Sequence, residues 1–141
     1  MNPELIKRGQ QTIDENKIDF TPLGTELLEK LDKVLQVIEK GKATDSLENQ
    51  KQSLTRPVME LKANAAFFNY ALIGNLANIM LSFLETINKL DKDAISIVRA
   101  HHGTLNSIIQ KKMVGDGGEH GKIFAKELQD ACNRYYNKRK K

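Results

Sequence analysis

The chain has 141 residues, 40% of them hydrophobic and 28% charged, as in an ordinary soluble globular protein of one domain with a real core. Its one cysteine, Cys132, excludes an internal disulfide and predicts a reduced, cytoplasmic compartment. Much of the net charge of +4 lies in the tail "NKRKK", residues 137–141, and the remaining chain is close to neutral. We therefore expect a solvated basic tail, and a nucleic-acid partner is not favoured.

Residues 1–20 begin the chain with a polar, weakly periodic segment, which we interpret as a loose N-terminal arm. This arm has no apolar core of signal-peptide length. Residues 21–41 are predicted to form the first helix, which Thr21 or Thr25 can cap and Gly41 can end. Spacings of three and four mark its buried face, which consists of Leu28, Leu31, Leu35 and Ile38.

Residues 44–70 are predicted to form the second helix, with Asp45 or Ser46 as its cap. Pro57 lies inside this segment and should kink or restart the helix, because proline lacks the N–H donor and crowds the preceding turn. The apolar residues form a single inward stripe, which consists of Leu47, Leu54, Val58, Leu61, Ala65 and Phe68.

The rest of the chain predicts three more helices, over about residues 71–88, from Asp91 or Asp93 onward, and from about Glu119 onward. A glycine-rich turn, residues 114–121, precedes the last one. The inward stripe of the fourth helix is Ala94, Ile95, Val98, His102, Leu105 and Ile109. That of the fifth helix is Phe124, Leu128, Ala131 and Tyr135.

No stretch of the sequence alternates with the period of two that a half-buried strand requires. We therefore predict an all-α fold, an antiparallel four-helix bundle with an additional N-terminal helix or arm, whose domain spans residues 21–136. The uncharged run of residues 63–84 is long enough for a membrane span, but its four asparagines oppose that interpretation.

The outward face of the second helix has an unusual composition. If Val58 and Leu61 face the core, Met59 faces outward, and its neighbours on the helix are Thr55, Lys62, Ala63 and Ala66. Exposed helix faces usually carry lysine, glutamate and glutamine, whereas this one offers a thioether, two methyl groups and one cation. Small residues let a partner backbone come close, and methionine packs adaptably. The face is either a docking patch or a surface that packs against the N-terminal arm or the first helix.

The stretch "VMELKANAAFFNY" resembles the core motif of histidine phosphotransfer (Hpt) domains, Ala-His-x-Leu-Lys-Gly followed by an aromatic residue and glycine. It is also similar to small alphaproteobacterial proteins of this type, in which "H-D-x-K-G-Q-x-x-x-F-G-Y" precedes a helix ending in "F-L-E". The resemblance covers roughly residues 50–136. The matching positions are Val58, Met59, Glu60, Leu61, Lys62, Ala63, Phe68, Asn69 and Tyr70, "SFLE" at residues 82–85 and "GDGG" at residues 115–118.

The departure from the family pattern is at the reactive position, because the phosphorylated histidine of the family falls on Met59. A thioether cannot accept a phosphoryl group, which needs a nucleophilic imidazole nitrogen. Lys62 matches the family lysine, which would favour the charge of a phosphohistidine, and Ala63 replaces the family glycine. The resemblance thus implies a shape that meets a response-regulator receiver domain, without the family's chemistry.

The histidines offer an alternative chemistry. His102 shares the stripe of Val98 and Leu105, so we expect it to be buried or half-buried, while His101 should be more open and His120 exposed. The adjacent His101 and His102 point about 100° apart on a helix and cannot easily share a metal ion. We find no enzyme constellation, and we expect no cofactor, no metal and no small-molecule substrate.

The function we predict is a non-catalytic Hpt-like module that binds a receiver domain or a histidine kinase in a two-component phosphorelay. The contact face would consist of Met59, Lys62, Ala63 and Ala66, with Glu60 and Phe67 near its margins. Two alternatives remain open: phosphotransfer through a relocated His101 or His102, and a helical interaction domain unrelated to phosphorelays. A homodimer through the Met59 face also remains open, because an exposed apolar patch can serve either use.

Overall fold

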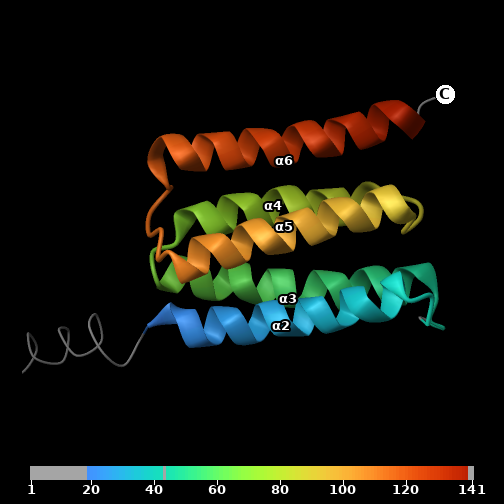
Figure 1. The fold of residues 1–141 in the computed structure, drawn as a ribbon, viewed down its shortest axis with the longest axis horizontal. Coiled ribbons are helices and arrows are strands. Elements are labelled where there is room, and N and C mark those ends of the chain that lie inside the picture. The colour runs from blue at the N-terminus through green and yellow to red at the C-terminus, as the bar shows by residue number, and fades with distance from the viewer. Residues whose placement is uncertain (1–18, 43, 140–141) are drawn as a thin grey trace, which may run out of the picture.

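The computed structural model of the protein describes residues 19–42 and 44–139, and these residues form helices and loops without a strand (Figure 1). The all-α prediction is therefore confirmed for this part of the chain. The helices are α2 (Phe20–Glu39), α3 (Leu47–Phe67), α4 (Ala71–Thr86), α5 (Lys92–Gln110) and α6 (Gly118–Arg139). None of these helices combines the length and the apolar character needed to cross a membrane.

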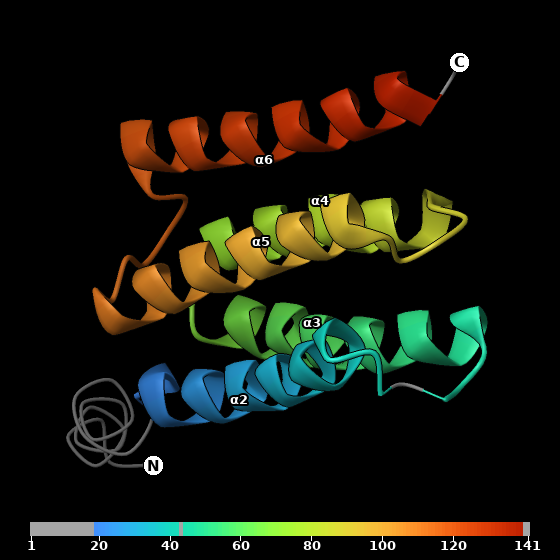
Figure 2. The same ribbon diagram turned by 45° about the vertical axis from the view of Figure 1, so that its right-hand side comes forward.

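The helices pack in tiers, and each helix runs back alongside the one before it (Figures 1 and 2). α2 contacts α3 and α5, and α4 contacts the same two helices, so that α2 to α5 close a ring of contacts. α6 packs on α4 and α5 from outside this ring. We predicted a four-helix bundle with an additional N-terminal helix or arm, and residues 1–18 lie outside the described residues. Among the described helices, the one outside the ring is the last, α6.

The apolar content of the two end helices explains this placement. The buried face of α2 has large side chains at most 2% exposed: Phe20, Leu27, Leu28, Leu31 and Leu35. α6 buries only Gly121, Cys132 and Tyr135, and its predicted inward residues Phe124, Leu128 and Ala131 are half-buried. A helix with a wide apolar face gains more from a central position than one with a narrow face.

The start of α2 differs from the prediction. Asp19 is the N-cap, and its carboxylate accepts a hydrogen bond of 2.9 Å from the backbone N–H of Thr21, so neither predicted threonine caps the helix. Phe20 is already the first helical residue because its ring packs against Phe68 and Tyr70, with centroids 5.3 and 5.1 Å away. The arm predicted for residues 1–20 otherwise lies outside the described residues.

α3 and α5 begin at residues that the sequence pointed to. The Ser46 hydroxyl accepts a hydrogen bond of 3.2 Å from the third N–H of α3, and the Asp91 carboxylate accepts one of 2.9 Å from the third N–H of α5. α3 does not restart at Pro57, because the buried Leu54 and Val58 hold the helix against the core on both sides of the proline. It ends at Phe67, and Asn69, with a φ of 65°, turns the chain toward α4.

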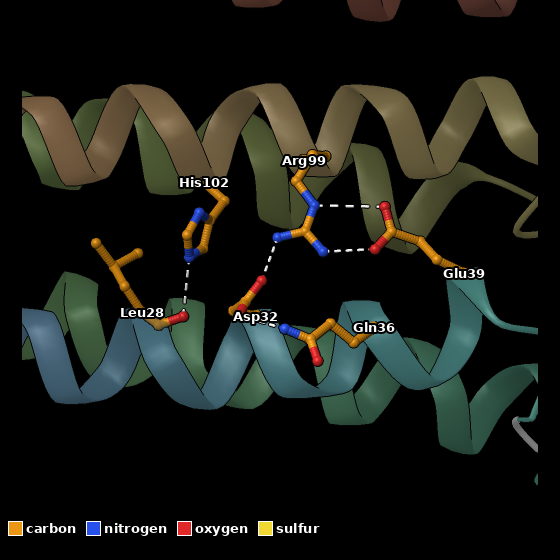
Figure 3. Close-up of polar contacts among 6 residues, drawn as sticks. All are labelled: Leu28, Asp32, Gln36, Glu39, Arg99 and His102. Carbon is orange, nitrogen blue, oxygen red and sulfur yellow. Dashed lines mark hydrogen bonds and ion pairs between the residues drawn. The ribbon is translucent and has the colours of Figure 1, made fainter.

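A polar cluster ties α2 to α5 on the outside of the ring (Figure 3). Arg99 of α5 donates hydrogen bonds to the carboxylates of Asp32 and Glu39 on α2. The hydrogen bond from Arg99 holds the pKa of Asp32 below its usual value. On the same side, His102 Nε2 lies 2.9 Å from the backbone oxygen of Leu28. The pairs are about one-third exposed, so each contributes modestly and their main effect is to align the two helices.

α6 runs to Arg139, so residues 137–139, which we expected in a solvated tail, continue the helix. Arg139 makes a 2.6 Å ion pair with Asp91 and lies 3.8 Å from the ring centre of Tyr135. Burial alone would raise the pKa of Asp91, but hydrogen bonds from Arg139 and from the N–H of Ala94 outweigh it and hold the pKa below its usual value. These contacts fasten the end of α6 to the start of α5.

Candidate functional site

The outward face of α3 carries the residues that the sequence singled out. Val58 and Leu61 are fully buried, and the helical turn therefore places Met59, Lys62, Ala63 and Ala66 on the surface. Met59 keeps 56% of its surface exposed, so α2 does not cover it. Among the described residues, the apolar atoms of this face stay exposed and can contact a partner.

This face forms one wall of a groove between α3 and α4, hereafter the α3–α4 groove. Its lining consists of Met59, Lys62, Ala63, Ala66, Tyr70, Ala71, Gly74, Asn75, Asn78 and Leu81. A second hollow shares Met59 and Leu81 with the groove and extends along the same two helices toward the start of α3. The two hollows together present a continuous surface with Met59 at their junction.

The wall contributed by α4 was not among the predicted site residues. Asn75 and Asn78 lie one turn apart and bring two side-chain amides to a groove that is otherwise rich in methyl groups. The sequence could have indicated these two asparagines, because polar residues in an apolar helix have to face a polar surface or a partner. Which neighbouring helix they would face, however, depended on the packing of α4 beside α3.

Glu60 and Phe67, predicted at the margins of the face, are both exposed on α3 and do not line the α3–α4 groove. Phe67 is 77% exposed, and its ring packs edge-on against Phe68 at a centroid distance of 5.3 Å. An exposed phenyl ring of this kind adds apolar surface at the end of the helix.

The two adjacent histidines of α5 are placed differently from our expectation. His101, expected to be more open, is 1% exposed, and neither ring nitrogen has a hydrogen-bond partner among the described residues. Burial, with a smaller effect from the nearby His102, lowers the pKa of His101 to about 3. His102 is half-buried, as expected, and reaches toward α2. The exposures of His101 and His102 are the reverse of our expectation because α6 covers a second side of α5. The single apolar stripe predicted for this helix did not include that side.

His120 and Cys132 are the other candidate groups that the structure describes. His120 is exposed and belongs to the first turn of α6. Cys132 is buried, as expected for a small hydrophobic residue, and burial raises the pKa of its thiol to about 11. Within residues 19–42 and 44–139, no three histidine, cysteine, aspartate or glutamate side chains are grouped so as to hold a metal ion.

No protein-family model, curated protein or solved structure matches the chain. The described residues 19–42 and 44–139 define an all-helical fold with an exposed, methyl-rich groove between α3 and α4.

Proposed function

We propose that the protein is a pseudo-phosphotransfer module that resembles the Hpt bundle and binds a response-regulator receiver domain or a histidine kinase without taking a phosphoryl group. In this proposal α2 to α5 form the antiparallel four-helix bundle, while the motif resemblance itself covers roughly residues 50–136, which belong to α3, α4, α5 and α6. The observation that carries it is the exposed face of Met59, Lys62, Ala63 and Ala66, which is continuous with the α3–α4 groove. The motif resemblance described above supplies the kind of partner.

The chemistry of the face suits binding without transfer. Met59 stands where the family has its histidine, and a thioether provides packing surface but no nucleophilic nitrogen. Ala63 and Ala66 keep the helix surface low, so a partner helix or loop can approach closely. Lys62 offers the only cation among the lining residues of the groove and can pair with an acidic group of a receiver. Asn75 and Asn78 can hydrogen-bond the partner at the opposite wall.

Transfer through a relocated histidine is a second hypothesis, and the burial of the histidines counts against it. A phosphoryl acceptor must reach the aspartyl phosphate of its donor, whereas both ring nitrogens of His101 are buried. His102 is half-buried beside Leu28. Incubation with a phosphorylated receiver tests this hypothesis, since an acid-labile, base-stable phosphate on the protein would support it and would contradict binding without transfer.

An interaction domain unrelated to phosphorelays is the third hypothesis, and it would use the basic C-terminal segment on nucleic acid or membranes. Lys138 and Arg139 already pair with Asp93, and Arg139 also pairs with Asp91, so part of this charge is neutralised within the fold. Salt-dependent DNA binding that is lost on deletion of residues 137–141 would favour this hypothesis.

The experiment that tests the proposal is an NMR titration of the isotope-labelled protein with receiver domains from its own organism, each with and without a phosphoryl mimic. Shifts should cluster at residues 59–66 and at the facing residues of α4. Ala63→Arg places a long charged side chain in the groove and should abolish the shifts. Ser53→Arg adds the same charge at another exposed position of α3 and should preserve them.

Shifts that survive Ala63→Arg unchanged would show that this face is not the contact. If no receiver or kinase shifts the spectrum while the free protein self-associates through the same residues, the face serves a homodimer and the phosphorelay proposal fails.

A further inference from the structure

A separate pocket lies between α4, α5 and α6, hereafter the α5–α6 pocket. Its volume is about 210 Å³, and it shares no lining residue with the α3–α4 groove. Leu76 and His101 are its buried lining residues, while Ser96, Ala100 and Glu127 are exposed at its rim. The half-buried side chains between them are Ile97, Thr104, Phe124, Leu128 and Ala131.

The presence of His101 in this lining is not explained by the packing of the helices. An imidazole buried with both nitrogens unpaired destabilises a fold, whereas an aliphatic residue at the same position would fill the space without that penalty. A buried polar group without a partner calls for an explanation, because native folds pair nearly all such groups. Since the ring lines the pocket, a bound molecule is a candidate partner for it.

The lining also defines what kind of molecule would fit. No lysine or arginine lines the pocket, and Glu127 at the rim would repel an anion. Most of the wall is aliphatic or aromatic, and the neutral imidazole offers one donor and one acceptor. An apolar cavity of about 150 Å³ holds benzene, so this pocket can take a single substituted ring.

We propose that the α5–α6 pocket binds a small, neutral ring compound that carries one hydroxyl group, and that His101 hydrogen-bonds this group. The imidazole turns about its outer side-chain torsion to bring a nitrogen into the pocket, and that torsion is soft. The hydroxyl either donates to the unprotonated ring nitrogen or accepts from the protonated one. Such a molecule would contact α5 and α6 at once and strengthen their packing. The site is one of binding and requires no reaction.

Phenol, toluene and benzoate test the proposal because they share one ring and differ in one substituent. Each is titrated into the full chain while the ring-nitrogen signals of His101 and the thermal midpoint are recorded. Phenol should shift the His101 nitrogen signals, raise the midpoint and bind about threefold to tenfold tighter than toluene, as one neutral hydrogen bond allows. Benzoate should bind more weakly than both.

Two variants, each with a matched control variant, separate recognition of the hydroxyl group from simple occupancy of the pocket. His101→Leu should remove the preference for phenol over toluene, whereas His120→Leu, at an exposed histidine outside the pocket, should leave it intact. Ala100→Phe, at the exposed rim, should weaken all three probes, whereas Asn133→Phe, exposed on α6 outside the pocket, should not.

The proposal is overturned if phenol leaves the His101 signals unchanged up to its solubility limit, which would mean that the pocket holds only water. It is equally overturned if His101→Leu retains the preference for phenol. Neither outcome bears on the α3–α4 groove, so failure here is distinguishable from failure of the docking proposal.

Discussion

Replacing His101 with leucine should flatten the dependence of stability on pH between about pH 7 and pH 5. His101 is almost wholly removed from water, because it is 1% exposed and no described residue hydrogen-bonds its ring. Burial therefore opposes protonation of this imidazole in the folded protein, whereas the unfolded chain offers no such resistance.

The size of the effect follows from the two pKa values. The ordinary value of 6.5 applies to the unfolded chain, and the value in the folded protein is about 3. Between them the unfolded chain binds more protons, so the stabilisation is fully present above the ordinary pKa and is lost as the pH falls toward the lower one. One pKa unit corresponds to about 1.4 kcal/mol, and the loss from pH 7 to pH 5 is therefore about 2 kcal/mol.

Urea unfolding of the wild type, His101→Leu and His120→Leu across this pH range is the appropriate measurement. Wild type and His120→Leu should both lose about 2 kcal/mol, and His101→Leu should lose little. Carboxylates such as Asp32 and Asp91 do not interfere, because their pKa values lie below the usual 3.8 and their stabilisation is lost only at lower pH. Equal slopes for wild type and His101→Leu would refute the description of His101 as a buried, neutral imidazole.

Three further predictions concern stability, each measured by urea unfolding at neutral pH. Ser46→Ala removes the N-cap hydrogen bond of α3 and should lower the free energy of unfolding by about 1 kcal/mol. An unchanged free energy of unfolding would mean that water fully replaces this hydrogen bond. Leu61→Ala should lower the free energy of unfolding by about 2–5 kcal/mol because the side chain is fully buried. Met59→Ala, at an exposed position, should lower it by less than about 0.5 kcal/mol. Similar losses for the two variants would contradict the assigned inward and outward faces. Gly74→Ala, in open space on α4, should raise the free energy of unfolding by about 0.5–1 kcal/mol. Gly121→Ala should lower it, because the added methyl group would clash with the backbone of the preceding turn. The opposite order of stabilities would contradict this local packing.

The sequence by itself determined the helices and the orientation of α3. Apolar spacing along one chain segment reports which residues share a face, and it placed Leu61 inward and Met59 outward without knowledge of any neighbour. The caps at Ser46 and Asp91 were also predictable, because capping depends on a side chain and the backbone of the next turn. The start of α2 was not, because the packing of Phe20 against aromatic residues more than forty positions away sets it.

Only the tertiary structure decided which helix lies outside the ring, which histidine is buried and what forms the second wall of the groove. A periodic stripe indicates one direction of burial, whereas α5 is packed against α2, α4 and α6. His101 is therefore buried although it lies off the predicted stripe, and His102 on that stripe keeps partial exposure. The same reason applies to Asn75 and Asn78, which lie on the α4 wall of the groove. Which two helices form the walls of a groove depends on contacts between helices, and no single segment of sequence encodes these contacts.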